Sequence, residues 1–535
     1  MKPEQITDAL TNLSEDLVAE TLANRRNRKK SRIPRSLWIG VAASLALVTG
    51  LLLWSGRESV LPDYMSEDQY IAYRIEPTSL AESENEPVVP TRPFSEEPLF
   101  FYSPTANMDE DRGTEDVSVA PTPTRHLLFA PKYPPMPPYP TAESGEEARK
   151  QWMEDKEQFY APVKDFEIPE GFMDFYRNTA QTFLAERQGD NATYSPLNLY
   201  LALSMLAEIT GGSTRQELLT LLGTETMEEV RENTAAFWLS NYCDDGVLTC
   251  KLGNSIWLRD DMSYNEKTLS TLAEIYRAAS YSGTMGSEEY TQDLRHWIND
   301  HTGGLLQDSA GEWEFDKNTV SALMSALHFK AIWTTPFSPR NTNDREFYGE
   351  SETVTTDFMH RVSIHPVYSG ENFTAVKLPM SDGTAMWFFL PDEGTSPQDL
   401  LEQDVIYDLP TYGKGANKRE LKLSLYLPKF DITVETDLME GLVELGLTEI
   451  FNPAVSDFSP LTEEGKEMCV SKVEHCARVK IDEKGGEAAV ITGTFVYAGA
   501  PAITEEVELV FDRPFVFVIT GRTGHPLFTG IVDQP

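Results

Sequence analysis

The chain has 535 residues and a formal net charge of −40, from 85 acidic and 45 basic side chains. This balance argues against nucleic acid as a partner, because phosphate binding needs basic patches, and we expect the charge to serve solubility. A hydrophobic content of 40% allows a large core, whereas four cysteines are too few for a disulfide scaffold.

Residues 37–54 read LWIGVAASLALVTGLLLW and carry no charge. At about 1.5 Å of rise per residue, this segment is just long enough to cross a bilayer as a helix, with Trp38 and Trp54 at the interfaces. Residues 1–36 form a basic tail, which places the N-terminus in the cytoplasm and the rest of the chain outside. The alternatives are a cleaved signal peptide, for which LLLWSGRES offers no A-x-A-like site, and a buried core helix.

Residues 55–165 are acidic and rich in proline, as in PKYPPMPPYPTAESGEE, and they show no apolar periodicity. A chain of this composition buries too little apolar surface to offset its ordering entropy. We therefore expect a disordered or partly extended stalk that separates the membrane helix from a domain over residues 166–535.

Residues 166–535 have the patterns of one large α+β domain. Phe172, Phe175, Thr179 and Phe183 mark one face of a first helix. A second helix is expected to end at Gly211-Gly212, and a third to begin at Ser213 as its N-cap. The alternation in LKLSLYLPKFDITVE and VELVFDRPFVFVI predicts long strands. Cys243 and Cys250 are near enough in sequence to be bridged across a turn.

A stretch without charge occupies residues 488–504. Every second residue from Gly486 to Ala498 is small or β-branched, so this face could be fully buried in a strand. Several glycines and Pro501 argue against a settled strand. The segment is therefore expected to become a strand only under some conditions.

In order and spacing, the motifs of this domain resemble the serpin family. The matching segments are SPLNLYLALSMLAEITGGSTRQELLTLLG, FKAIWTTPF, LPKFDIT, LVELGLTEIF, KIDEKGGEAA, VELVFDRPFVFVI and HPLFTGIVDQP. The resemblance implies three β-sheets, eight to nine helices and an exposed reactive-centre loop. It also implies inhibition of a serine or cysteine protease, which attacks the loop as a substrate and is trapped when the cleaved loop inserts into the large sheet.

The resemblance also assigns roles to individual residues. Counting from the family's hinge glutamate places the scissile bond between Gly499 and Ala500, whereas counting back from FDRPF points near Ile503. Tyr497 and Ala498 are neighbouring candidates. The absence of Arg and Lys between Glu487 and Arg513 favours an elastase-like or subtilisin-like target, and Tyr497 would favour a chymotrypsin-like one. The hinge residues implied are Glu483, Gly485, Gly486, Glu487, Ala488 and Ala489.

A further group of residues matches the family's cluster beneath the opening sheet: Asn191, Ser195, Asn198, Ser325, Trp333 and His475. Asn198 stands where the family usually has serine, and Ser325 where it usually has asparagine. We expect the two exchanges to compensate, because one amide and one hydroxyl remain in the network.

No enzyme motif such as HExxH, GxSxG or Walker A occurs, and we expect neither cofactor nor metal. His360 and His365 would face opposite sides of a strand. These features predict a monomeric, single-pass membrane protein, bacterial in origin, with an extracellular inhibitor domain that guards the cell surface. Two alternatives remain: a non-inhibitory serpin that acts as a surface binding module, and a sensor that signals through the stalk to residues 1–30.

Overall fold

The computed structural model describes residues 126–140, 144–184, 189–304, 313–317, 319–463, 468–471, 473–485 and 505–535. The expected basic tail, the membrane helix at 37–54 and the stalk up to residue 125 lie outside these ranges. Within the described part of the chain, no helix combines the length and apolar character needed to cross a membrane.

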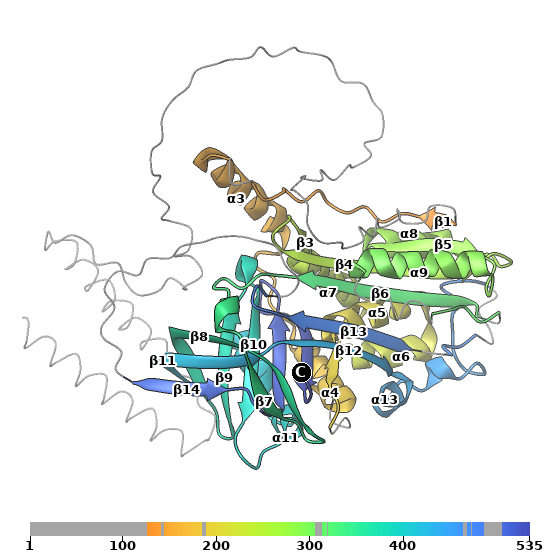
Figure 1. Cartoon of the computed structure of the whole chain (residues 1–535). Coiled ribbons are helices and arrows are strands. Elements are labelled where there is room, and N and C mark those ends of the chain that lie inside the picture. Colours follow the sequence, from red (N-terminus) through yellow and green to blue (C-terminus); the bar gives the residue numbers. More distant parts are fainter. Residues whose placement is uncertain are drawn as a thin grey trace, which may run out of the picture. The chain divides into compact units, whose positions relative to one another are not determined.

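Helices and strands alternate along the described chain (Figure 1). The α-helices are α3 (Glu146–Tyr160), α4 (Glu170–Leu184), α5 (Pro196–Ile209), α6 (Gly212–Leu221), α7 (Met227–Asn241), α8 (Glu266–Glu274), α9 (Glu288–Thr302), α11 (Pro397–Leu401), α12 (Asp404–Tyr412) and α13 (Met439–Glu444). Single 3₁₀ turns are η2 (Ala161–Val163), η3 (Pro339–Asn341), η4 (Ser381–Gly383) and η5 (Glu449–Phe451).

The strands are β1 (Leu127–Phe129), β2 (Ala192–Tyr194), β3 (Cys243–Asp244), β4 (Thr249–Arg259), β5 (Ala278–Gly283), β6 (Ser321–Lys330), β7 (Asn343–Tyr348), β8 (Thr353–Ser369), β9 (Phe373–Pro379), β10 (Ala385–Pro391), β11 (Asn417–Pro428), β12 (Phe430–Asp437), β13 (Glu474–Ile481), β14 (Glu506–Val510), β15 (Phe515–Thr520) and β16 (Pro526–Val532). The α+β class and the strands predicted around residues 421–435 and 507–519 are confirmed.

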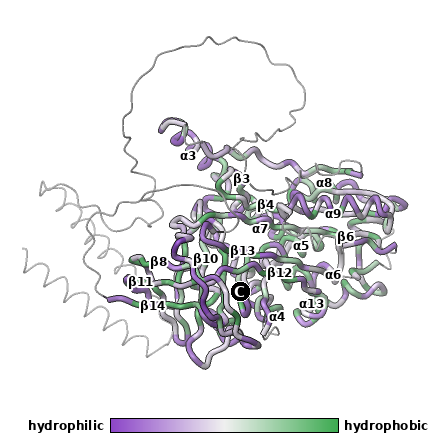
Figure 2. Tube along the Cα trace, in the orientation of Figure 1, coloured by the Kyte–Doolittle hydropathy of each residue, from purple (hydrophilic) through white to green (hydrophobic). Residues whose placement is uncertain are grey.

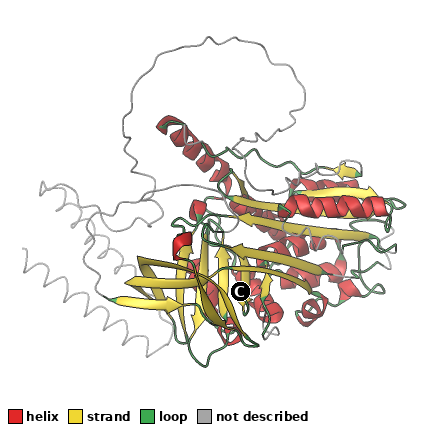
Figure 3. Ribbon diagram, in the orientation of Figure 1, coloured by secondary structure: helices red, strands yellow, loops and turns green. Residues whose placement is uncertain are grey.

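These strands form three sheets within the described residues. The five-stranded sheet has the order β1-β5-β4-β3, with β6 paired to β4. A nine-stranded sheet runs β14-β11-β8-β9-β10-β15-β16-β2, with β7 on β8, and β12 pairs with β13 in a two-stranded ribbon. The strands of the nine-stranded sheet gather at one end of the domain in Figure 3, and most helices pack toward the other.

The core lies around α5 and the central strands of the nine-stranded sheet. Every residue of α5 except Ala202 is buried, as expected for a helix that is apolar on all sides. All residues of β10, β15 and β16 are buried as well, and β10 is hydrophobic over most of its length (Figure 2). Helix α5 contacts both β6 and β16, so it packs against the five-stranded and the nine-stranded sheet.

The predicted helix boundaries are partly right. The four residues predicted on the buried face of the first helix are all buried in α4. The third helix, however, begins at Gly212 with Gly211 as N-cap, so the prediction of Ser213 is wrong. A distant residue determines this start, because the Gly211 amide donates to the Asp457 carbonyl at 2.8 Å and the Asp457 amide donates to the Thr214 hydroxyl at 3.1 Å.

The expected stalk over residues 55–165, disordered or partly extended, includes two ordered elements, β1 and α3, that belong to the folded domain. Strand β1 pairs antiparallel with β5, and α3 places Lys156 in a buried ion pair with Asp245. An extended proline-rich segment shows no apolar periodicity even when it is docked, which is why the sequence pattern did not reveal it. Figure 1 shows this segment running beside β4 and β3 toward α3.

Cys243 and Cys250 lie directly opposite each other in the β3–β4 ladder. Both side chains are buried thiols and no disulfide joins them.

Candidate functional site

The loop that the sequence singles out lies between two described anchors. The chain is described up to Gly485 and again from Glu505. The scissile-bond candidates Tyr497, Ala498, Gly499, Ala500 and Ile503 lie outside the described residues, as do the hinge residues Gly486, Glu487, Ala488 and Ala489. The structure therefore shows how the loop is attached at each end.

The first anchor is a turn at the end of β13, over Trp333. The Trp333 indole Nε1 donates to the Asp482 carbonyl at 2.9 Å, and its amide donates to the Lys484 carbonyl at 2.9 Å. The Asp482 amide donates to the Gly485 carbonyl at 3.0 Å, so the chain already reverses direction here. Trp333 is 1% exposed and thus serves both as a core aromatic and as the support of the hinge.

Gly485 occupies a position between two strand ends. It forms one antiparallel bridge with Asp482, just beyond β13, and another with Ile332, just beyond β6. Its φ is +130°, and a Cβ at this position would lie 2.5 Å from the Ala331 carbonyl oxygen. Only glycine fits such a close backbone approach without displacement.

A carboxylate fastens this turn to the neighbouring sheet. Glu483 Oε1 accepts a hydrogen bond from the Thr342 hydroxyl at 2.8 Å, and Oε2 lies 3.4 Å from Lys429 Nζ. The Phe337 amide also donates to the Glu483 carbonyl at 2.8 Å. Burial alone would raise the pKa of Glu483, but the hydrogen bonds and the charge of Lys429 outweigh it, so the pKa is lowered and the group is ionised at neutral pH. We call Glu483, Thr342 and Lys429 the hinge latch.

The second anchor is β14, which pairs in parallel with β11. The Lys422 amide donates to the Glu505 carbonyl at 3.0 Å, and its Nζ lies 2.5 Å from a carboxylate oxygen of Glu506. Arg419 pairs with the Glu505 side chain. After a cut in the loop, the C-terminal side would stay in this ladder, and only the N-terminal side could move.

A gap in the strand pairing lies next to the hinge. Among the described residues, β6 pairs with β4 alone, and β13 pairs with β12 alone. Most side chains of β6 are only half buried, unlike those of the central strands. The facing edges of β6 and β13 therefore carry backbone groups that an additional strand could satisfy.

The N-terminus of α5 connects both sides of this gap. The Ser195 amide donates to His475 Nε2 at 3.1 Å, which attaches β13 to the helix. Asn198 Nδ2 donates to the Ser325 carbonyl at 2.8 Å, and the Ser325 hydroxyl donates to Asn198 Oδ1 at 2.5 Å, which attaches β6. Ser195 Oγ accepts from the Asn198 amide at 3.2 Å and so connects the two groups.

Asn198 and Ser325, the two positions at which the family's usual serine and asparagine are exchanged, are thus in direct contact. Neither side chain is bonded to His475 itself. The Ser325 hydroxyl also contacts Asn254 Oδ1 on β4 at 2.8 Å. Sequence reasoning missed Asn254, along with Thr342 and Lys429, because each is far in sequence from its partner. Lys429 lies within the family-matching segment LPKFDIT, but that segment does not reveal its contact with Glu483.

His475 is held in its neutral form. Burial lowers its pKa from 6.5 to about 4, because the imidazolium would lose its hydration. A neutral ring leaves Nε2 able to accept the Ser195 amide, as the geometry requires. Protonation would remove this acceptor and place a charge beneath the sheet.

Asn191 lies apart from this cluster. Its Nδ2 donates to the Gln534 carbonyl at 2.6 Å, and its Oδ1 accepts from the amides of Asp533 and Gln534. The side chain therefore fastens the C-terminus after β16. The structure places Ser195, Asn198, Ser325 and His475 together and Trp333 at the hinge, with Asn191 at the chain end.

Within the described residues, no group of three or more His, Cys, Asp or Glu side chains could hold a metal ion. His360 stacks on Tyr426, and His365 contacts the Lys377 carbonyl.

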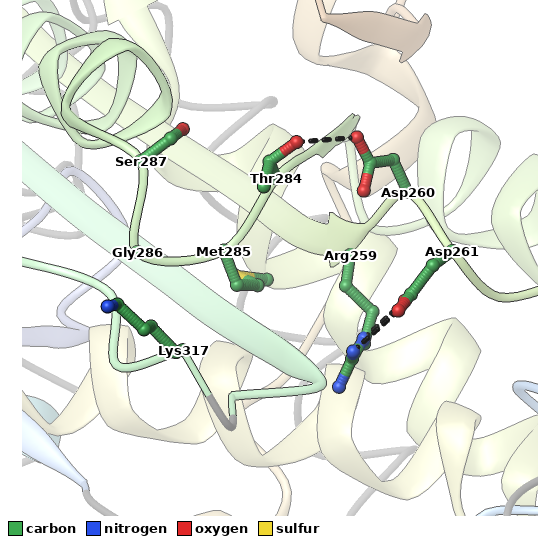
Figure 4. Close-up of a pocket in the computed structure, with 8 residues that line it drawn as sticks. All are labelled: Arg259, Asp260, Asp261, Thr284, Met285, Gly286, Ser287 and Lys317. Carbon is green, nitrogen blue, oxygen red and sulfur yellow. Dashed lines mark hydrogen bonds and ion pairs between the residues drawn. The ribbon is translucent and has the colours of Figure 1, made fainter.

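A surface cavity of about 380 Å³ lies between the end of β4 and the start of α9, where Arg259 pairs with Asp261 and Thr284 with Asp260 (Figure 4).

Comparisons with known proteins agree with this arrangement. The family model Serpin (serine protease inhibitor) matches residues 170–535. Serpin-ZX of Arabidopsis thaliana is 28% identical, over 65% of this chain and 93% of the relative, and alpha-1-antiproteinase 2 of Equus caballus is 29% identical, over 71% and 90%. The solved structure of human thyroxine-binding globulin complexed with thyroxine is 26% identical over 68% of this chain and 97% of that one, with a TM-score of 0.59. The chain belongs to the serpin family.

Proposed function

We propose that this protein inhibits serine or cysteine proteases as a suicide substrate. The observation that carries the proposal is the position of Gly485, which bridges the ends of β6 and β13 at the open edge between them. The bridges of Gly485 are the first pairing of a new strand, and the residues that follow would extend it into a full strand antiparallel to β13. The uncharged alternate face from Gly486 to Ala498 suits that burial, because an unpaired charge there would cost several kcal/mol.

The covalent step uses the protease's own chemistry. Its serine or cysteine attacks the carbonyl carbon of the scissile peptide bond and forms an ester or thioester, while the amine of the next residue leaves with a proton. The new N-terminus remains attached through β14. The released loop then inserts between β6 and β13, carrying the acylated protease with it and distorting its active site before water completes hydrolysis. The protein itself acts as inhibitor rather than as enzyme.

The proposed target is an elastase-like, subtilisin-like or chymotrypsin-like protease, according to which candidate bond is cut. We further propose that the protein is monomeric and is held outside the cell by a single membrane span at residues 37–54. This location rests on the apolar segment and its basic flank. The relatives reported above are plant and mammalian, so the proposed bacterial origin rests on the same N-terminal features alone.

A binding function without inhibition is the second candidate. It is favoured by the likeness to thyroxine-binding globulin, whose structure contains thyroxine. The two candidates differ in whether loop cleavage leads to a covalent complex.

The test uses a fragment of residues 100–535, which keeps β1 and α3. The fragment is incubated with pancreatic elastase, subtilisin and chymotrypsin and separated on denaturing gels. Inhibition predicts a band near the summed mass, and mass spectrometry of the released C-terminal peptide identifies the scissile bond. Cleavage without such a band by every protease tested would reject inhibition in favour of the binding function.

A further inference from the structure

The segment before the serpin domain contacts the five-stranded sheet along its outer side. We call residues 126–140 and 144–163 the N-terminal arm. At its start, the His126 carbonyl accepts from the Ser282 amide at 2.8 Å, and β1 continues this pairing along β5. His126 Nδ1 lies 2.7 Å from Asp293 Oδ2 on α9. The arm therefore adds a strand to the edge of this sheet.

The middle of the arm is fixed by aromatic contacts and one backbone bond. Tyr133 stacks on Trp238 and Tyr242 of the α7 end, with ring centroids 5.6 and 5.9 Å apart. The Tyr139 amide donates to the Asp245 carbonyl in the β3–β4 turn at 2.8 Å. These contacts order a proline-rich segment that forms few hydrogen bonds of its own.

The end of the arm joins two different sheets through one buried lysine. Lys156 Nζ lies 2.8 Å from Asp245 Oδ2 and 2.9 Å from Asp382 Oδ2. The exposed fractions of the side chains are 6% for Lys156, 2% for Asp245 and 21% for Asp382. Asp245 belongs to the β3–β4 turn of the five-stranded sheet, whereas Asp382 lies in η4, between β9 and β10 of the nine-stranded sheet.

A second contact strengthens this junction. The Arg522 guanidinium lies over the Tyr160 ring, 3.6 Å from its centre, and pairs with Asp382 at 3.0 Å. Arg522 follows β15 in the nine-stranded sheet, and the Tyr160 hydroxyl donates to the Tyr242 carbonyl at 2.7 Å. Helix α3 thus binds both sheets with partly or fully buried groups.

We propose that the N-terminal arm is a brace that holds the five-stranded sheet in place against the nine-stranded sheet and thereby slows the opening between β6 and β13. Opening this gap moves β6, and with it β4 and the β3–β4 turn, relative to the nine-stranded sheet. Because Lys156 pairs with Asp245 on one sheet and Asp382 on the other, that movement must separate it from one of the two carboxylates. The separation would leave a buried carboxylate without its partner, which is unfavourable. The proposal deepens the proposed function, since it concerns the gap that the loop would enter.

The test compares Lys156→Gln with Lys150→Gln in the full-length chain in detergent. Lys150 is an exposed lysine of the same helix, 3.9 Å from Glu154, and serves as the matched control. The first readout is hydrogen–deuterium exchange of β4, β6 and β13. The second is the rate at which a labelled synthetic peptide with the sequence of residues 486–499 binds as an added strand.

We expect Lys156→Gln to increase exchange in β4 and β6 and to speed peptide binding by about tenfold, with no change for Lys150→Gln. Unchanged exchange in β4 and β6, with faster exchange in α3 showing that the arm has been released, would overturn the brace. If Lys156→Gln does not fold, Tyr133→Ala releases the arm without leaving a buried carboxylate unpaired, and the same criteria apply to it. Failure of the wild-type protein to bind the peptide or trap proteases would count against the proposed function, while the exchange comparison would still decide the brace.

Discussion

Replacing Glu483 by lysine should release the hinge and accelerate loop insertion before any protease acts. In the latch, the carboxylate accepts the Thr342 hydroxyl at 2.8 Å and lies 3.4 Å from Lys429 Nζ. A lysine at this position would lose both contacts and would add repulsion against Lys429. The backbone bond from Phe337 to the Glu483 carbonyl does not depend on the side chain and should remain.

The size of the effect follows from the exposure of these groups. A hydrogen bond to a charged group contributes about 1.5 kcal/mol or more. The exposed fractions are 14% for Glu483 and 33% for Lys429, so the ion pair adds at most about 1 kcal/mol after solvent screening. Together with the new repulsion, the substitution removes about 3 kcal/mol of the free energy that holds the hinge. If the latch opens before the transition state of insertion, spontaneous insertion becomes roughly a hundredfold faster. Glu483→Gln keeps an acceptor for Thr342 and should cost only about 1 kcal/mol, roughly fivefold.

The assay measures spontaneous conversion of the 100–535 fragment at constant temperature. Samples taken over time are tested for protease trapping and for the denaturant resistance that an inserted loop confers. Glu444→Lys, at an exposed position on α13, is the control for the charge change. The reasoning is refuted if Glu483→Lys converts no faster than Glu444→Lys, or if Glu483→Gln converts as fast as Glu483→Lys.

Three further predictions concern residues around the gap. Because burial lowers the pKa of His475 from 6.5 to about 4, the histidine of the unfolded state is protonated first as the pH falls. The protein therefore loses stability between pH 6.5 and 4. In urea unfolding, the wild type should lose about 2 kcal/mol more than His475→Gln between pH 7 and pH 5. Asn198→Ser should cost about 1–2 kcal/mol, and adding Ser325→Asn should restore part of it; strictly additive urea-unfolding costs would contradict the compensation. Gly485→Ala should place a Cβ against the Ala331 carbonyl and so disturb the bridge between Gly485 and Ile332. Titration should then show more inhibitor molecules cleaved for each protease trapped, and an unchanged number would show that this bridge is dispensable.

The sequence predicted the parts of the fold that depend on local pattern. Helix α4 follows from apolar residues at helical spacing, and α5 from its almost continuous apolar run. Strands β14 and β15 follow from alternation around FDRPF. The contact of Asn198 with Ser325 was anticipated from the family resemblance, because the two exchanges keep one amide and one hydroxyl.

The parts that were missed depend on partners distant in sequence. The hinge latch joins Glu483 to Thr342 and Lys429, which precede it by 141 and 54 residues in the sequence, and no local pattern shows that they meet. The acidic and proline-rich composition of the arm is typical of disorder, whereas its attachment depends on strand pairing with β5, one buried lysine and a few aromatic rings, all with partners distant in sequence. The assignment of the scissile bond stays a prediction, because residues 486–504 lie outside the described part of the chain.

The most direct test of loop insertion is the thermal stability of the 100–535 fragment before and after a single cut in the loop. About ten new ladder hydrogen bonds at about 1 kcal/mol each add about 10 kcal/mol of stability. Divided by an unfolding entropy of about 0.8 kcal/mol/K for a domain of about 370 residues, this raises the unfolding midpoint by about 13 °C. Hydrogen exchange should show protection of residues 486–498 in the cut protein at the same time. A cut protein that unfolds at the temperature of the intact one, with those residues still exchanging freely, would contradict insertion and with it the proposed inhibitory mechanism.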